Sequence, residues 1–204
     1  MVLIKLWLKA LKRNLKPNFF LWILKGFNLP APQKIKTRIL KRNAFENGNW
    51  VETGTYLGDT TKFLARNFPQ ILITSLEPDL NLYLFNKSRL KRFKNVKLVN
   101  GTSENSLREI ISNENDTVNF WLDGHFSGDI TYKGKVLSPI IEELEIIEHN
   151  ISRLKVCVFI DDIRDFVGEE RSGYPDKNQL VDWAVRNNLD WRIEMDIFIA
   201  KSRV

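Results

Sequence analysis

NWVETGTYLGDTTKFL, residues 49–64, decides the fold of this chain. A short apolar run ends at the carboxylate of Glu52, and two glycines follow at Gly54 and Gly58. The residues from Thr60 to Asn67 are predicted to form a helix. A strand, a glycine turn and a helix in this order present backbone N–H groups to a ligand at the start of the helix. We therefore expect a ligand site at this turn of an α/β sheet.

The glycine spacing differs from the dinucleotide-binding pattern G-x-G-x-x-G, because Tyr56 stands where that pattern has its second glycine. That glycine lets the backbone approach a pyrophosphate. Its absence disfavours an NAD- or FAD-dependent oxidoreductase.

The length of 204 residues suits one α/β domain with a substantial core plus an extension. The single cysteine, Cys157, excludes an intrachain disulfide and suits a reducing compartment, so we expect a cytoplasmic protein. Cys157 lies in an apolar run, which favours a buried, inert thiol over a nucleophile.

The net charge of +6 is unevenly distributed. Residues 1–45 contain eleven of the 31 basic residues and no acidic residue, so the remaining chain has 20 basic against 25 acidic residues. The basic character therefore belongs to the N-terminal segment. Nucleic-acid binding by the rest of the chain is not expected.

Residues 1–28 are predicted to form a basic helical arm ahead of a domain of residues 29–204. Apolar side chains lie on one face of the first helix and lysines on another. The apolar face comprises Ile4, Leu8, Leu11 and Leu15, and the lysines are Lys5, Lys9, Lys12 and Lys16. The apolar run 19–24 is far shorter than the roughly 20 residues of a membrane span. Two interpretations stay open. The arm lies on an anionic membrane at the inner face, or it packs on the domain or on a second subunit of a homo-oligomer.

From residue 49 onward, predicted strands and helices alternate. We expect strands at 50–52, 71–76, 96–99, 118–122 and 156–160, with short strands at 191–194 and 197–200. We expect helices at 33–44, 60–67, 80–93, 103–112, 139–150 and 177–188. Repeated units of this kind predict an α/β fold, a Rossmann-like and mostly parallel sheet with helices on both faces, preceded by the basic helical arm.

Four of the five strands that are expected to be parallel end in acidic residues. These residues are Glu52, Glu77, Asp123 and the pair Asp161-Asp162. Ligands of open α/β sheets bind beyond the carboxyl ends of the strands, where these carboxylates are expected to meet. Glu77 is suited to accept both ribose hydroxyls of a nucleoside, and Glu52 is suited to meet a cationic amino group.

Asp123 and the Asp161-Asp162 pair form a second candidate site. Adjacent carboxylates repel one another, and a divalent cation is the usual reason to tolerate them beside a third acid. Oxygen ligands favour Mg²⁺, Mn²⁺ or Ca²⁺. In the alternative, one member of the pair only caps a loop. His125 is a candidate general base or metal ligand, with a merely hydrogen-bonded loop histidine as the other interpretation.

Six segments resemble a group of small bacterial class I S-adenosylmethionine-dependent methyltransferases. They are VETGTYLGDTT, SLEPD, FWLDGHFSGDIT, SPIIEELEII, VFIDDIRDF and SGYP. The resemblance runs from about residue 29 to residue 200. The Asp-Gly and Asp-Asp elements are also similar to metal-dependent sugar O-methyltransferases of the macrocin type.

This resemblance implies S-adenosylmethionine as the methyl donor and Mg²⁺, or Mn²⁺ or Ca²⁺, as a metal cofactor. The implied donor-binding residues lie in the glycine turn and at the strand ends: Glu52, Gly54, Thr55, Tyr56, Gly58, Thr60, Glu77, Pro78, Thr102, Ser103 and Asp123. In the macrocin-type enzymes the acid at the fourth strand and the pair after the fifth hold the metal, which implicates Asp123, Asp161 and Asp162. Asp123 and His125 are the candidate catalytic residues.

Two segments depart from the resembling chains. Those chains often have Gly-Asp-Ser after the third strand, with an acid facing adenine, where this chain has Gly101-Thr102-Ser103. The macrocin-type enzymes have a tyrosine-bearing loop where this chain has His125-Phe126-Ser127. The adenine contact and the acceptor therefore do not carry over.

The favoured hypothesis is methyl transfer to a hydroxyl oxygen of a small-molecule or glycan acceptor, such as a sugar or glycoconjugate, assisted by a divalent cation. The alternative, from a different class, is a non-catalytic nucleoside-binding or membrane-associated partner protein on the same fold.

Overall fold

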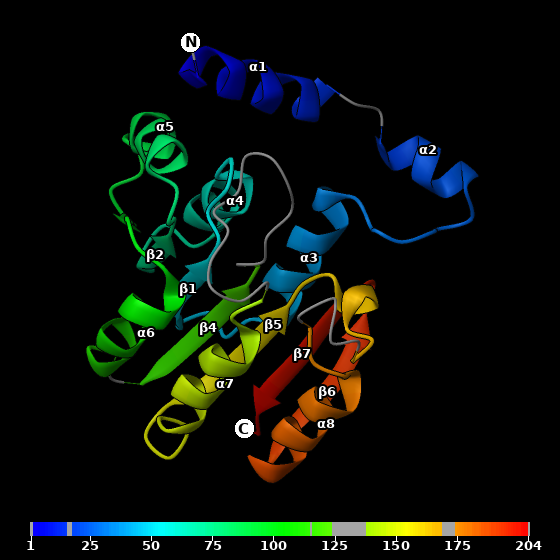
Figure 1. The fold of residues 1–204 in the computed structure, drawn as a ribbon, viewed down its shortest axis with the longest axis vertical. Helices are drawn as coiled ribbons and strands as arrows, with labels where there is room; N and C mark the ends of the chain where they lie inside the picture. Colours follow the sequence, from blue (N-terminus) through cyan, green and yellow to red (C-terminus); the bar gives the residue numbers. More distant parts are fainter. Residues whose placement is uncertain (1, 16–17, 115, 124–137, 169–173, 204) are drawn as a thin grey trace.

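A seven-stranded sheet lies at the centre of the protein, in the order β3-β2-β1-β4-β5-β7-β6 (Figure 1). The computed structural model describes residues 2–15, 18–114, 116–123, 138–168 and 174–203. The strands are β1 (Asn49–Thr53), β2 (Ile73–Leu76), β3 (Val96–Val99), β4 (Thr117–Leu122), β5 (Lys155–Ile160), β6 (Leu189–Glu194) and β7 (Ile197–Ser202). Strands β1 to β5 pair in parallel, whereas β7 runs antiparallel to β5 and β6. The predicted mostly parallel α/β sheet is confirmed.

Helices cover both faces of the sheet (Figure 1). They are α1 (Val2–Leu15), α2 (Asn18–Leu24), α3 (Gln33–Asn43), α4 (Asp59–Asn67), α5 (Leu80–Leu90), α6 (Ser103–Ser112), α7 (Ile140–Glu148) and α8 (Lys177–Arg186), with a short 3₁₀ helix η1 (Ile163–Asp165). Helices α3 and α4 pack on one face, and α6, α7 and α8 pack on the other.

The central strand β4 is covered by helices on both faces of the sheet. All six of its residues are buried. Val118 and Phe120 pack on the side of α6 and α7, while Trp121 packs on the side of α3 and α4. A strand that is covered on both faces takes mainly apolar side chains on both of them. The polar side chain of Asn119 is also buried, and it forms hydrogen bonds with the backbone of Phe45 and Gly48.

The strand register brings the expected carboxylates to one edge of the sheet. Thr53 pairs with Leu76 on one side and with Leu122 on the other, and Leu122 pairs with Ile160. The residues that follow these positions are Glu77, Asp123 and Asp161-Asp162, which therefore emerge at neighbouring strand ends. Three of the four predicted acidic positions therefore lie at this edge, while Glu52 lies within β1.

Helix α1 of the arm lies across α5 (Figure 1). Leu6 and Ala10 are buried there in a cluster with Leu57 and Phe85. The apolar face that the sequence predicts on this helix is a different one, and its described members are exposed. Among the helices of the described ranges, none is long and apolar enough to cross a membrane.

Candidate functional site at the carboxyl edge of the sheet

The glycine turn after β1 has an unusual backbone. Gly54, Tyr56 and Gly58 all have positive φ angles, of 92°, 48° and 71°. A Cβ atom on Gly58 would lie 2.4 Å from the side-chain oxygen of Asn86. Glycine is therefore required at position 58 both by its left-handed backbone and by the close approach of α5. The tight turn that the sequence predicts is confirmed.

Glu77 holds this turn in place. One of its carboxylate oxygens accepts a hydrogen bond from the backbone N–H of Tyr56 at 2.7 Å, and the other accepts from the N–H of Asp79 at 3.0 Å. Burial raises the pKa of Glu77 from 4.5 to about 7, and these two N–H groups offset part of the rise. Each carboxylate oxygen can accept a second hydrogen bond, so Glu77 keeps the capacity to bind a vicinal pair of hydroxyls.

Glu52 lies beneath the turn and is fully buried. The hydroxyls of Thr61 on α4 and Ser75 on β2 both donate to one of its oxygens at 2.6 Å. Burial raises its pKa to about 7 despite these two bonds. Glu52 therefore ties β1, β2 and α4 together beneath the turn. Its expected contact with a ligand amino group stays a prediction.

The other implied donor-binding residues also lie around this edge. Thr55 is buried, and its hydroxyl shares a hydrogen bond of 2.6 Å with Ser75. Thr60 accepts a hydrogen bond from the Gln33 side chain at 2.7 Å. Pro78 is half-buried after β2, while Thr102 and Ser103 begin α6. The structure brings these positions to the expected edge, and their contacts with a donor stay predictions.

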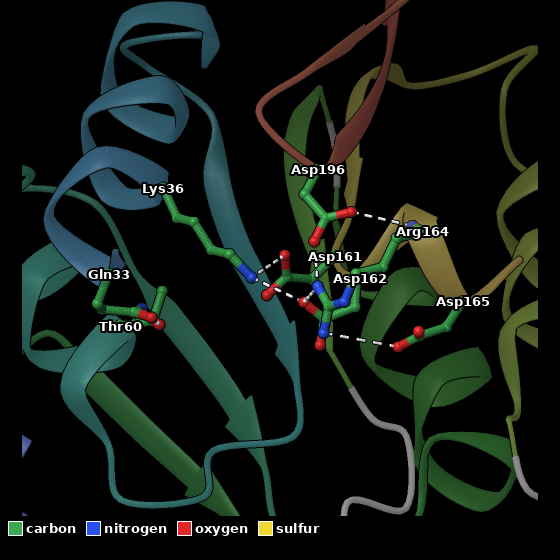
Figure 2. Close-up of polar contacts among 8 residues, drawn as sticks. All are labelled: Gln33, Lys36, Thr60, Asp161, Asp162, Arg164, Asp165 and Asp196. Carbon is green, nitrogen blue, oxygen red and sulfur yellow. Dashed lines mark hydrogen bonds and ion pairs between the residues drawn. The ribbon is translucent and has the colours of Figure 1, made fainter. Parts of the chain in front are cut away.

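The second carboxylate cluster is also assembled. Oxygen atoms of Asp123, Asp161 and Asp162 all lie within 4.8 Å of one another. The ammonium of Lys36, from α3, donates to Asp161 at 2.6 Å and to Asp162 at 2.8 Å (Figure 2). Lys36 is almost completely buried. This chain thus supplies a cation of its own to two of the three predicted metal ligands.

Arg164 and Asp196 extend the cluster (Figure 2). Arg164 donates to Asp162 at 2.7 Å and also pairs with Asp196, whose carboxylate is buried at the turn between β6 and β7. Asp162 itself has a positive φ of 55°. With every group ionised, the four aspartates, Lys36 and Arg164 carry two net negative charges.

The electrostatics of the cluster follow from burial and charge. The pKa of Asp161 is raised to about 7, mainly by burial and also by the charge of Asp123, while Lys36 acts in the opposite direction. Burial lowers the pKa of Lys36, but the charges of Asp161 and Asp162 together outweigh that effect, so its pKa is raised. A carboxylate donor set with this net charge fits a hard divalent cation. Lys36 occupies oxygens that such a cation would also use.

On the face of the sheet that α6, α7 and α8 cover, a cavity reaches the ends of β4 and β5. It is lined by apolar and polar residues, among them Leu122, Ile160, Asp161, Tyr174 and Glu143. Glu143 is fully buried on α7, and neither of its oxygens meets hydrogen-bond geometry with the described residues. Burial raises its pKa to about 7, and the nearby hydroxyls of Ser103 and Thr53 offset part of that rise.

Sequence reasoning missed Lys36, Arg164 and Asp196 as members of this region, and it assigned Glu143, in the segment SPIIEELEII, no role beyond a structural one. A signal existed for Lys36, because it lies on the same face of α3 as Leu40 and Asn43, which are also buried. A lysine on the buried face of a helix needs a partner. His125, the candidate base, lies outside the described residues.

Comparisons with known proteins bear on the fold. No protein-family model and no curated protein matches the sequence. Similar solved structures include a precorrin-6y C5,15-methyltransferase from Geobacter metallireducens, with 12% identity, a TM-score of 0.56, and coverage of 86% of this chain and 92% of that one. The chain has the class I methyltransferase fold.

Two further structures share this fold. A methyltransferase from Geobacter sulfurreducens is 14% identical with a TM-score of 0.54, and the match covers 97% of this chain and 96% of that one. A SAM-dependent methyltransferase from Aquifex aeolicus is 12% identical with a TM-score of 0.51, and the match covers 84% and 94%. At these identities the likeness establishes the fold alone.

Proposed function

We propose that this chain transfers a methyl group from S-adenosylmethionine to a hydroxyl oxygen of a small-molecule or glycan acceptor, such as a sugar or glycoconjugate. The observation that carries the proposal is the link between Glu77 and the glycine turn. A carboxylate suited to a ribose is bonded to the turn that presents backbone N–H groups, at the edge where this fold binds ligands. The methyltransferase fold supports the same donor.

The donor would lie across the ends of β1, β2 and β4. Glu77 would accept the ribose hydroxyls, and the turn from Gly54 to Gly58 would follow the methionine portion of the donor. The acceptor oxygen would then attack the methyl carbon in line with the bond to sulfur, which breaks. The products are a methyl ether and S-adenosylhomocysteine, and the acceptor proton passes to a base, for which His125 is the candidate.

A divalent cation forms the finer part of the proposal. Asp123, Asp161 and Asp162 would hold it, and when bound it would lower the pKa of the acceptor hydroxyl and orient it. Lys36 competes for oxygens of Asp161 and Asp162, whereas Arg164 and Asp196 fix the backbone turn that carries Asp162. The contacts of Arg164 and Asp196 restrict the positions that the Asp162 carboxylate can adopt.

Lys36 also favours a second version of the same function. Its ammonium already neutralises charge between Asp161 and Asp162, so methyl transfer in that version proceeds without a metal ion. Turnover after exhaustive chelation separates the two versions. Activity that persists favours the lysine, and activity that returns only with Mg²⁺ favours the cation.

The proposal is tested by methyl transfer from radiolabelled S-adenosylmethionine to a panel of hydroxylated acceptors, with Asp161→Asn as the variant. We expect this variant to lose turnover and to keep its affinity for S-adenosylhomocysteine, because Asp161 acts on the acceptor side. Wild-type turnover by Asp161→Asn in the presence of a chelator would contradict the assigned role. Donor binding without turnover on any acceptor would favour a non-catalytic nucleoside-binding protein.

A further inference from the structure

Helix α1 attaches to the body by a narrow stripe and leaves its broad apolar face open. Among the described side chains of this helix, residues 2–11, Leu6 and Ala10 are buried. Ile4, Leu8 and Leu11, which lie on the side of the helix away from Leu6 and Ala10, are exposed to 65%, 53% and 58%. Burying apolar side chains is the main reason that a helix packs on a domain. The contact with the body therefore does not account for most of the apolar character of α1.

Exposed apolar side chains continue beyond α1. On α2 and the turn after it, Leu24 and Phe27 are exposed to 82% and 54%. Helix α5, on which α1 packs, adds exposed Leu80 and Leu84. Single exposed apolar residues are ordinary, but three on one face of one helix, as on α1, mark a surface that meets another apolar phase.

The charge of the arm identifies the kind of surface that it would meet. Residues 1–28 contain six Lys or Arg residues and no acidic residue, while residues 29–204 contain 25 of each sign. The helical arm therefore carries the entire net charge of the chain. The described lysines of α1, Lys5 and Lys9, are exposed beside its apolar face. Apolar and cationic faces side by side on one helix are typical of peptides that bind anionic lipid head groups.

We propose that the helical arm, residues 1–28, lies on an anionic membrane surface, with the exposed apolar side chains of α1 and α2 between the lipid head groups. A second copy of this chain is the less favoured occupant, because a symmetric pairing would bring two arms of charge +6 together. The inference stands apart from the reaction proposed above, since it uses none of the carboxylates at the sheet edge.

The arm also touches the ligand edge. Leu6 shares a buried cluster with Leu57 of the glycine turn, and the Lys9 ammonium lies 5.3 Å from the centre of the Tyr56 ring. An arm bound to a membrane would therefore hold the glycine turn close to the bilayer. Acceptors whose hydroxyls lie at the level of the head groups would be the ones within reach.

The test is co-sedimentation of the full chain with vesicles of phosphatidylcholine alone and of phosphatidylcholine mixed with phosphatidylglycerol. The test variant is the triple substitution Ile4→Gln, Leu8→Gln and Leu11→Gln, which changes exposed positions only. The matched control is Val185→Gln with Ile193→Gln, two exposed apolar positions on α8 and β6. Circular dichroism verifies that each variant is folded, and Lys5→Glu gives a second, charge-reversing variant.

We expect the wild type and the control to bind the anionic vesicles, and the triple variant to bind about tenfold more weakly or worse. Lys5→Glu should also weaken binding, and added salt should weaken wild-type binding. Wild-type protein that stays in the supernatant, or a folded triple variant that sediments like the wild type, would overturn the proposal. So would a wild-type dimer by light scattering that binds no vesicles and dissociates in the triple variant.

Discussion

The substitution Glu143→Gln is expected to stabilise the protein in mildly alkaline solution and to have little effect in mildly acidic solution. Glu143 is fully buried, and burial raises its pKa from 4.5 to about 7. Between these two values the folded protein binds a proton that the unfolded chain does not bind. The stabilisation from this proton is complete below 4.5 and is lost as the pH rises through 7.

The magnitude follows from the rise in pKa. The rise in the pKa of Glu143 from 4.5 to about 7 corresponds to about 1.4 kcal/mol for each pH unit. Near pH 8, ionised Glu143 therefore lowers the free energy of unfolding by about 3 kcal/mol. Glutamine has nearly the same shape and cannot ionise, so the variant avoids that penalty. Near pH 5 the wild-type carboxyl is mostly protonated, so by the same relation the variant and the wild type should differ in free energy of unfolding by less than about 1 kcal/mol.

Urea unfolding of wild type and variant at about pH 5 and about pH 8 measures both free energies of unfolding. Glu142→Gln is the matched control, because Glu142 precedes Glu143 on α7 and is exposed. The control should change stability by no more than about 0.5 kcal/mol. An equal effect of Glu143→Gln at both pH values, or a loss of stability near pH 8, would refute the assignment of Glu143 as a buried carboxyl with a raised pKa.

Three further predictions concern the turn, the carboxylate cluster and the cysteine. Lys36→Met should strengthen Mn²⁺ binding by about tenfold or more, because it frees oxygens of Asp161 and Asp162, whereas Lys36→Arg should not. Electron paramagnetic resonance measures the affinity, and equal Mn²⁺ affinity in the wild type and both variants would contradict competition between Lys36 and the metal ion. Gly58→Ala should cost about 1–3 kcal/mol and weaken donor binding. The control Gly26→Ala has nearly the same φ but nothing within 4 Å, so an equal loss in both variants would show that the contact with Asn86 is unimportant. Burial raises the pKa of Cys157 to about 12, so its thiol should react with a disulfide reagent only after unfolding, and rapid labelling of the native protein would contradict this.

Much of the fold could be predicted because the central strands β1, β2, β4 and β5 are largely buried on both faces and are rich in apolar residues. The helix at 103–112 and the strand at 96–99 match α6 and β3 at both ends. The helix expected to reach Phe93 ends instead at Leu90, since a turn of the chain leads from there into β3. The ends of elements depend on such local turns, which hydrophobic periodicity does not report.

The site was predictable where it depends on strand ends and not where it depends on packing between distant segments. Glu77 and Asp123 follow apolar runs, so parallel pairing alone brings them to one edge. Lys36 reaches Asp161 from a helix 125 positions earlier in the chain, and only the packing of α3 on the sheet reveals the contact. The arm shows the same limit, because periodicity found the apolar face of α1 but not that Leu6 and Ala10 would make the contact.

The central claim is that the carboxyl edge of the sheet binds S-adenosylmethionine through Glu77 and the glycine turn. Its most direct test is calorimetric titration with S-adenosylhomocysteine of the wild type, of Glu77→Gln and of Glu109→Gln, an exposed acid on α6 as control. The account predicts binding by the wild type and the control, with or without magnesium, and affinity lower by about tenfold or more in Glu77→Gln. No binding by the wild type in either condition, or equal binding by Glu77→Gln, would contradict it.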